Sequence, residues 1–205
     1  MRILITETDA GIDEAAVGRL RAAGHAVARC FDPGAGPSRP CVGLDRDACP
    51  LDQPGGVDVV VDVRAPDRPR PTRREAGLTC ALRQHVPMVL VGAGRPNPHA
   101  RWTTVALDGG GDIVAACDEA IGRRLADLGA TVSIAACRVL DHVRAEDRPG
   151  AAVRTEVERS GGDLHVLVHR PPTAAALDGA IAARAHRALR DAGVDVPSIS
   201  IACAD

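Results

Sequence analysis

The stretch Val57-Asp-Val-Val-Val-Asp-Val63 decides the fold class of this chain. It is short and apolar almost throughout, which is typical of a strand that is buried on both faces of a sheet. Strands of this kind belong to parallel sheets, because crossover helices between successive strands cover both faces with apolar side chains. The stretch therefore predicts an α/β domain around it.

Segments on both sides of this stretch alternate between the two periods that such a domain requires. Short apolar runs predict strands over residues 2–6, 26–30, 57–63, 87–92 and 102–107. Apolar residues spaced three and four apart predict helices over residues 12–23, 72–85 and 113–128. Gly24 and Gly129 are expected to end the first and third helices, and Thr72 with Glu75 forms a capping box for the second.

The last part of the chain follows a different order. It predicts helices over 131–143 and 174–192, and strands over 152–158, 164–169 and 198–203, with a hairpin signal at Ser160-Gly-Gly-Asp163. In the first of these helices, Val132, Ile134 and Ala136 also alternate as in a strand, so a strand is the alternative there. We therefore predict an α/β domain over residues 1–128, with a five-stranded parallel sheet and a cysteine-containing insertion at 31–56. A small α+β domain of the order αββαβ is predicted over residues 129–205.

Three segments of the first domain resemble the receiver domain of bacterial response regulators. They are Arg2-Ile-Leu-Ile-Thr-Glu-Thr-Asp-Ala10, Val57-Asp-Val-Val-Val-Asp-Val-Arg-Ala-Pro-Asp67 and Val86-Pro-Met-Val-Leu-Val-Gly-Ala93. The resemblance covers roughly residues 1–128 and implies a flavodoxin-like sheet with a reaction site at the carboxyl ends of its strands.

The resemblance also assigns roles that this chain fills only in part. Asp62 falls on the aspartate that accepts phosphate, and Glu7 falls on one acid of the Mg²⁺-binding pair, but Thr8 replaces the other acid. Gly92 or Ala93 replaces the hydroxyl residue after the fourth strand, and the chain contains no lysine to follow the fifth. We expect a pseudo-receiver that has lost phosphotransfer.

The second domain is similar in element order to the alkaline-shock protein family and to the cytoplasmic domain of cation-efflux transporters. Units of this kind commonly pair edge to edge, which implies a homodimer. A sheet of only three strands also leaves edges that need covering.

A cysteine pattern marks the long segment between the second and third predicted strands. Cys30, Cys41 and Cys49 are candidate thiolate ligands for zinc or an iron–sulfur cluster, and Pro50 follows the third. The segment 31–56 has few large apolar side chains, so it needs packing, a crosslink or a metal to be fixed.

Several alternatives for these thiols stay open from the sequence. A fourth ligand could come from His25, Asp45 or Asp47, or Cys41 and Cys49 could form a reversible disulfide. The thiols could also be ordinary side chains of a loop. The remaining cysteines fall within regular elements and are expected to be small core residues: Cys80, Cys117, Cys137 and Cys203.

Glycines gather where two strands end. Gly92, Gly94, Gly109, Gly110 and Gly111 are candidate cofactor-binding residues, because exposed backbone N–H groups beside a helix start favour anions. A nucleotide, flavin or other phosphorylated ligand would suit such an edge, while a tight turn is the simpler interpretation. The first strand is not followed by the G-x-G-x-x-G fingerprint of dinucleotide-binding domains.

Composition excludes several classes of function. All 25 basic residues are arginine, so chemistry that needs a lysine is absent, and the net charge of −2 gives no electrostatic case for nucleic acid or an anionic membrane. One Phe, one Trp and no Tyr leave no platforms for stacked bases. No apolar run is long enough for a signal peptide or a membrane span, and seven cysteines, an odd number, favour a reducing compartment, so we expect a cytoplasmic protein.

These observations favour a non-catalytic regulatory or protein-interaction protein, acting with a protein partner that the sequence does not identify. Two alternatives remain. One is a metal or iron–sulfur protein that uses Cys30, Cys41 and Cys49. The other is an enzyme that binds a phosphorylated ligand at the glycine-rich edge of the sheet.

Overall fold

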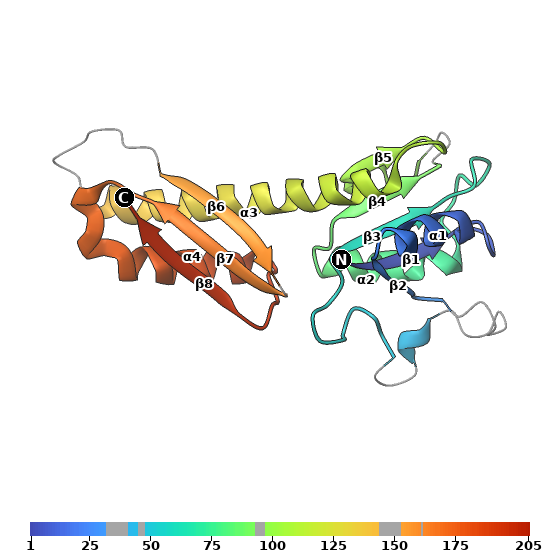
Figure 1. Cartoon of the computed structure of the whole chain (residues 1–205), viewed down its shortest axis with the longest axis horizontal. Helices are drawn as coiled ribbons and strands as arrows, with labels where there is room; N and C mark the ends of the chain where they lie inside the picture. Colours follow the sequence, from blue (N-terminus) through green and yellow to red (C-terminus); the bar gives the residue numbers. More distant parts are fainter. Residues whose placement is uncertain (32–40, 45–47, 93–96, 144–152, 161) are drawn as a thin grey trace. The chain divides into compact units, whose positions relative to one another are not determined.

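The computed structural model describes residues 1–31, 41–44, 48–92, 97–143, 153–160 and 162–205. The chain divides into two compact units, Met1–Arg123 and Arg124–Asp205 (Figure 1). Gly94, Asp45 and Asp47, which the sequence marks as candidate ligands, lie outside the described residues.

The first unit contains the predicted five-stranded parallel sheet. Its strands are β1 (Arg2–Glu7), β2 (Ala26–Arg29), β3 (Val59–Val63), β4 (Met88–Val91) and β5 (Val105–Leu107). The strand order is β2-β1-β3-β4-β5, the order of flavodoxin-like sheets. The predicted α/β fold is thus confirmed. The order reverses between β1 and β3, and ligands of open α/β sheets bind at such a point.

Helices cover both faces of this sheet. One face packs against α1 (Glu14–Ala22) and α3 (Ile113–Val143), and the other packs against α2 (Ala76–Arg83). Short 3-10 helices complete the connections: η1 (Val42–Leu44), η2 (Arg73–Glu75) and η3 (Ala100–Trp102). The side chains of β3 alternate between the two layers, which explains why this strand is apolar almost throughout.

Local signals place α2 as predicted. Thr72 and Glu75 form the expected capping box, in which Glu75 Oε2 accepts the backbone N–H of Thr72 at 2.5 Å. The box starts as the 3-10 turn η2 and continues into α2. It also fixes the Glu75 carboxylate at the carboxyl end of the sheet.

The helix predicted to end at Gly129 does not end there. α3 runs without interruption from Ile113 to Val143, so this part of the prediction is wrong. A Cβ at Gly129 would lie 3.3 Å from Thr155 Oγ1, and the Thr155 hydroxyl donates to the Gly129 carbonyl at 2.6 Å. The glycine therefore permits close approach of a strand, and its weak helix propensity, about 1 kcal/mol below alanine, is too small to stop a long helix.

The second unit is a three-stranded sheet with helices. Besides the last part of α3, its elements are β6 (Arg154–Ser160), β7 (Asp163–His169), η4 (Pro172–Leu177), α4 (Asp178–Asp191) and β8 (Ile199–Ala204). The strand order is β6-β7-β8, antiparallel for the first pair and parallel for the second. The predicted order of elements in this part of the chain is confirmed.

The core of the second unit lies between its sheet and two helices. Apolar side chains of β7 pack with the last part of α3 and with α4, including Val132, Val166 and Ile181. The opposite face of the sheet carries exposed polar residues such as Glu156 and His165. β6 and β8 form the edges of this sheet within the described chain.

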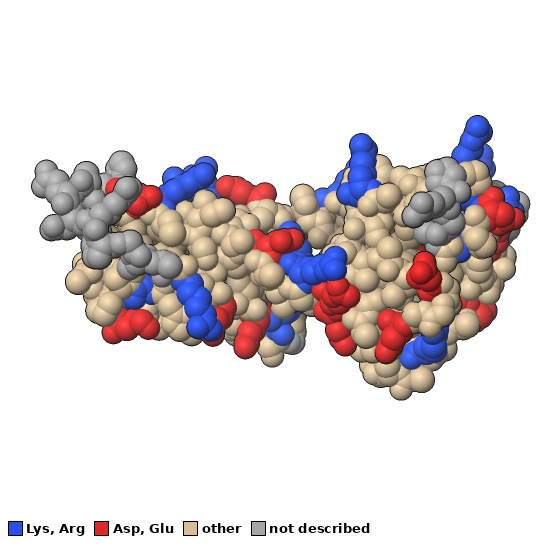
Figure 2. Space-filling model, turned by 90° about the horizontal axis from the view of Figure 1, so that it is seen from above, with Lys and Arg blue, Asp and Glu red and all other residues tan. Residues whose placement is uncertain are grey.

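The surface carries charges of both signs. Figure 2 shows arginines and acidic residues interspersed over the visible face of the molecule, with no large region of one sign. In the part of the chain that the structure describes, no helix has the length and apolar character needed to cross a membrane.

Candidate functional site

A buried polar network lies at the carboxyl ends of β1 and β3. Asp62 is the next-to-last residue of β3 and pairs in register with Thr6 of β1. Its side chain points toward the layer of α2 and is 0% exposed. The Thr6 hydroxyl donates to Asp62 Oδ1 at 2.7 Å. Asp62 is therefore part of the interior of the protein, and does not cap a helix or loop.

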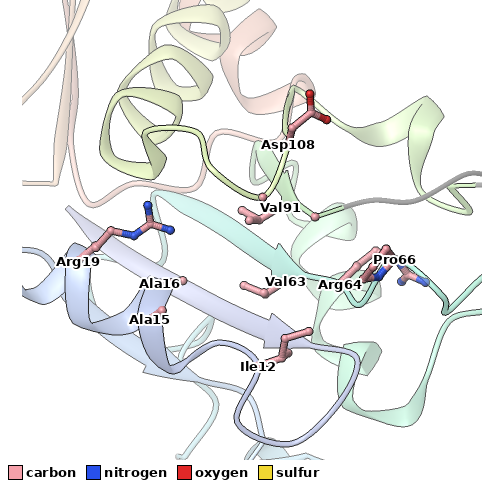
Figure 3. Close-up of a pocket in the computed structure, with 11 residues that line it drawn as sticks. Ile12, Ala15, Ala16, Arg19, Val63, Arg64, Pro66, Val91 and Asp108 are labelled. Carbon is pink, nitrogen blue, oxygen red and sulfur yellow. The ribbon is translucent and has the colours of Figure 1, made fainter.

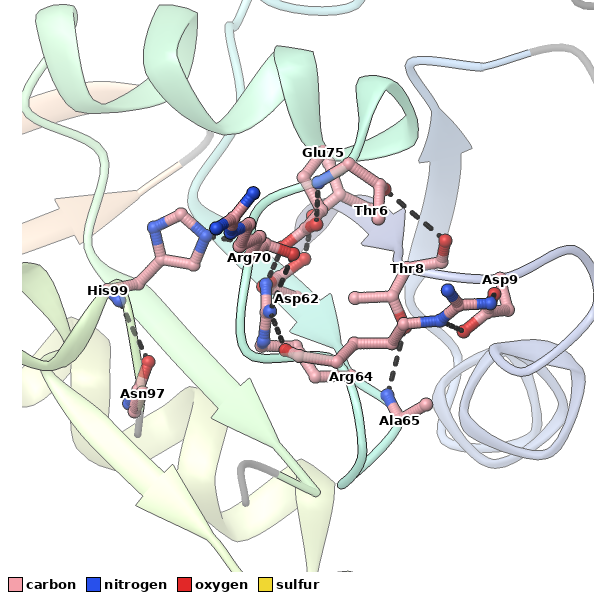
Figure 4. A network of polar contacts seen from close by, with 12 residues as sticks. Thr6, Thr8, Asp9, Asp62, Arg64, Ala65, Arg70, Glu75, Asn97 and His99 are labelled. Carbon is pink, nitrogen blue, oxygen red and sulfur yellow. Dashed lines mark hydrogen bonds and ion pairs between the residues drawn. The ribbon is translucent and has the colours of Figure 1, made fainter. Parts of the chain in front are cut away.

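Arg64 joins this carboxylate to two other elements (Figure 4). Its Nη1 lies 3.8 Å from Asp62 Oδ2 and forms an ion pair with Glu75 Oε1. Its Nη2 donates to the backbone carbonyl of Arg68 at 2.6 Å. His99, which precedes η3, places Nε2 3.1 Å from Glu75 Oε1. Five buried polar side chains from four segments of the chain thus share one network: Thr6, Asp62, Arg64, Glu75 and His99.

Burial controls the protonation of this network. Burial raises the pKa of Asp62 above its ordinary value, while the Thr6 hydrogen bond, His99 and Arg64 act in the opposite direction. Burial likewise lowers the pKa of His99, with Asp62 raising it and Arg64 lowering it further. Both groups are therefore shifted toward their neutral forms.

Asp62, Glu75 and His99 have the donor types of a metal site. Their donor atoms lie within 4.8 Å of one another. However, the guanidinium of Arg64 pairs with Glu75 and lies 3.8 Å from Asp62 Oδ2, so a cation already stands beside both carboxylates. We therefore interpret the cluster as an ion-pair network that fixes the carboxyl edge of the sheet.

The other positions to which the sequence resemblance assigns a role are also engaged within the protein. Glu7 accepts the backbone N–H of Gly11 at 2.8 Å and a bond from Arg74 Nη1 at 2.6 Å. Burial, followed by the charge of Asp13, raises the pKa of Glu7. The hydroxyl of Thr8 accepts a bond from a backbone N–H in the segment after β3, at 2.9 Å. A second acid for Mg²⁺ is therefore missing, and an arginine balances the acid that is present.

A cleft of about 400 Å³ opens beside this edge, between α1 and the carboxyl ends of β3 and β4 (Figure 3). Ile12, Ala15 and Arg19, on α1 and the turn before it, form one side. Val63 and Val91, at the ends of β3 and β4, form the other. The lining is mostly apolar with a few charged groups, a composition that suits a small ligand with one polar end.

Two of the predicted glycines line this cleft. Gly92 and Gly109 lie at its rim, whereas Gly110 and Gly111 belong to the turn before α3. The N–H of Gly92 donates to the carbonyl of Leu107 at 3.0 Å. Its φ is +75°, and a Cβ there would lie 2.6 Å from the carbonyl oxygen of Arg64, so only glycine fits.

The start of α3 already has an anionic cap. Asp112 Oδ1 accepts the backbone N–H groups of Val114 and Ala115 at 2.9 and 3.2 Å. Gly111 donates to the carbonyl of Asp108 at 3.0 Å. These donors, which could have bound a phosphate, are satisfied by the protein, and anion binding by the glycine-rich turn stays a prediction.

The three candidate metal ligands lie at the amino end of the long segment and beside η1. Cys30 Sγ and Cys41 Sγ are 3.8 Å apart. A Cβ at Gly43 would lie 3.3 Å from Cys41 Sγ and 3.4 Å from Cys49 Sγ, so both sulfurs face one bare stretch of backbone. All three are free thiols. The structure thus brings together residues that the sequence separates.

The structure also tests the expectations for His25 as a fourth ligand and for the remaining cysteines as core residues. His25 precedes β2 and Cys30 follows it, so the strand separates them by roughly 16 Å and His25 is no fourth ligand. Cys80 is exposed on α2, so its assignment to the core is wrong. Cys117 is 0% exposed, as expected of a core residue, and Cys137 and Cys203 are half-buried.

Burial raises the pKa of the Cys30 thiol to about 12. The neighbouring thiols of Cys41, Cys49 and Cys80 raise it further. The last of these neighbours comes from α2, far away in the sequence, and no motif points to it.

Comparison with protein-family models and with curated protein sequences finds no match to this chain. The interpretation of its sites therefore rests on their geometry.

Proposed function

We propose that this chain is a non-catalytic regulatory or interaction protein of the cytoplasm, built on a receiver-like domain that works without phosphotransfer. The observation that carries the proposal is the complete burial of Asp62, the residue in the position of a phosphate acceptor. An acceptor carboxylate must be open to a phosphodonor and to a divalent ion that screens the converging negative charges.

Three features of the site oppose that reaction. The Asp62 carboxyl is 0% exposed and bonded to Thr6. Burial raises the pKa of Asp62 above its ordinary value, so the interior opposes the charged carboxylate that would attack a phosphodonor. The cation beside Asp62 is Arg64, which Glu75 holds in place. Mg²⁺ can displace a bound water, but it cannot displace this side chain.

The second unit supports an interaction role. Its edge strands β6 and β8 pair with no further strand in the described chain, and such edges are templates for pairing with another chain. A second copy of this chain is the partner we propose first. The free cysteines in the described part of the chain fit a reducing cytoplasm.

Phosphorylation in vitro tests the proposal. The full chain is incubated with acetyl phosphate and Mg²⁺, and its intact mass is measured at once and after hydroxylamine treatment, which cleaves acyl phosphates. We expect no added mass. The variant Asp62→Asn, which keeps a side-chain oxygen for the Thr6 hydrogen bond, is the control. A stoichiometric phosphoryl adduct that disappears in Asp62→Asn would refute the proposal.

The cleft of about 400 Å³ favours a second candidate, a binding site for a small phosphorylated or flavin ligand. Arg19 supplies a cation beside apolar walls. Flavin mononucleotide and ADP are suitable probes, titrated by calorimetry against the full chain. Ala15 is exposed and lines the cleft, so Ala15→Phe should fill the cleft without disturbing the core. Binding that survives Ala15→Phe, or no binding at all, would exclude this candidate.

A further inference from the structure

Cys80 lies on the face of α2 that receives the thiol of Cys30. A Cβ at Gly77 would lie 2.6 Å from Cys30 Sγ, so that thiol rests directly against the bare backbone of the helix. Residues three apart on a helix share a face, and helical side chains lean toward the N-terminus. The side chain of Cys80 therefore leans back toward Gly77 and the Cys30 thiol.

The spacing of the first pair of sulfurs matches two ligands of one ion. Zinc–thiolate bonds of about 2.3 Å in a tetrahedron place neighbouring sulfurs about 3.8 Å apart. Cys30 Sγ and Cys41 Sγ are separated by 3.8 Å. A disulfide would need about 2.05 Å, so the two sulfurs are unbridged thiols in hydrogen-bonding contact, at a spacing that a shared ion would not have to change.

Backbone N–H groups point at the sulfurs of the other two segments. The N–H of Gly43 donates to Cys41 Sγ at 3.3 Å. The backbone of Leu51 and Asp52 hydrogen-bonds to Cys49. Hydrogen bonds of this kind stabilise a thiolate over a thiol, and they orient the sulfur for an ion as an outer shell of a metal site does.

We propose that Cys30, Cys41, Cys49 and Cys80 bind one zinc ion as a closed site of four thiolates. This site deepens the three-cysteine pattern of the sequence by adding a ligand from α2. It is independent of the phosphotransfer argument. On binding, Zn²⁺ displaces the thiol protons to solvent and no oxidation occurs. With all four positions filled by protein, the ion is structural and leaves no place for substrate.

The ion would fix the connection between β2 and β3 to the body of the domain. Cys30 follows β2, Cys41 and Cys49 lie on either side of η1, and Cys80 belongs to α2. No third sulfur of the described residues lies within 4.8 Å of both Cys30 and Cys41, so binding draws Cys49 and Cys80 inward. Because Cys80 is exposed, a change of rotamer suffices for it, and its exposure also gives the ion a way in.

The test is elemental analysis of the full chain, purified without chelator and again after addition of ZnCl₂ and gel filtration. We expect one equivalent of zinc in the natural chain. Each of four single variants should retain at most about one tenth of that zinc: Cys30→Ser, Cys41→Ser, Cys49→Ser and Cys80→Ser. Cys137→Ser and Cys203→Ser, in the second unit, are matched controls and should keep the full equivalent.

Cys80→Ser is the decisive variant, because an exposed helix position tolerates serine and the protein should stay folded. Its circular dichroism should match that of the natural chain, and replacement of zinc by Co²⁺ should give the intense visible bands of tetrahedral thiolate coordination only in the natural chain. Zinc retained by folded Cys80→Ser would overturn the four-thiolate site. No zinc in the natural chain, or iron with acid-labile sulfide, would overturn it as well. The phosphorylation experiment is indifferent to all these outcomes.

Discussion

Removing the cation of the buried network should destabilise the first unit strongly. The side chains of Arg64, Asp62 and Glu75 are 2%, 0% and 1% exposed, so Arg64→Met leaves two carboxylates in the interior without their shared partner. Breaking a buried ion pair from one side costs about 3–5 kcal/mol. Glu75 keeps its contacts with His99 and with the backbone of Thr72, so we expect about 3 kcal/mol, at the lower end of that range.

Urea unfolding at neutral pH measures this loss. Trp102, the single tryptophan of the chain, lies in the first unit, so its fluorescence reports the unfolding of that unit. Arg68→Met is the matched control, because Arg68 is 53% exposed and pairs with Asp9 at the surface, where loss of an ion pair has little effect. Adding Asp62→Asn to Arg64→Met should restore part of the stability. A loss below about 1 kcal/mol for Arg64→Met, with an unchanged m-value, would refute the network as a stabilising element.

Three further predictions concern His99, Gly77 and the edge strands of the second unit. Burial lowers the pKa of His99 below 6.5 in the folded protein, so the unfolded chain binds a proton first as the pH falls through 6.5, and stability should fall toward acid pH. His99→Gln should flatten this pH dependence in urea titrations, and an unchanged slope would contradict the pKa shift. Gly77→Ala should lower stability by about 1–3 kcal/mol, because the new Cβ would meet Cys30 Sγ. Gly18→Ala in α1, where a Cβ meets nothing within 4 Å, should raise stability instead. Equal effects of the two variants in thermal melts would contradict the packing against Cys30. The full chain should form a dimer through the edges β6 and β8 in light-scattering measurements, and a clean monomer at tens of micromolar would remove that proposal.

The local parts of this fold could be predicted from the sequence. The valine run of β3, the capping box of Thr72 and Glu75, and the switch from strand to helix spacing each depend on residues a few positions apart. The helix stop expected at Gly129 was wrong, because the local cue was weak and the packing of β6 against α3 uses the same glycine. Propensity at one residue is too small to decide against a tertiary contact.

The candidate sites depend on contacts that local patterns do not contain. Asp62 was visible as a residue of a strand, but its hydrogen bond from Thr6 follows from the order of strands in the sheet, and the approach of His99 to Glu75 follows from the tertiary fold. The sequence pattern predicted Cys80 in the core, but the packing of α2 on the sheet places Gly77 against Cys30 and leaves Cys80 exposed. The sequence by itself determined which segments bury their apolar side chains. Only the tertiary structure decided which polar groups and thiols meet, because those groups are far apart along the chain and are brought together by the packing of the apolar ones.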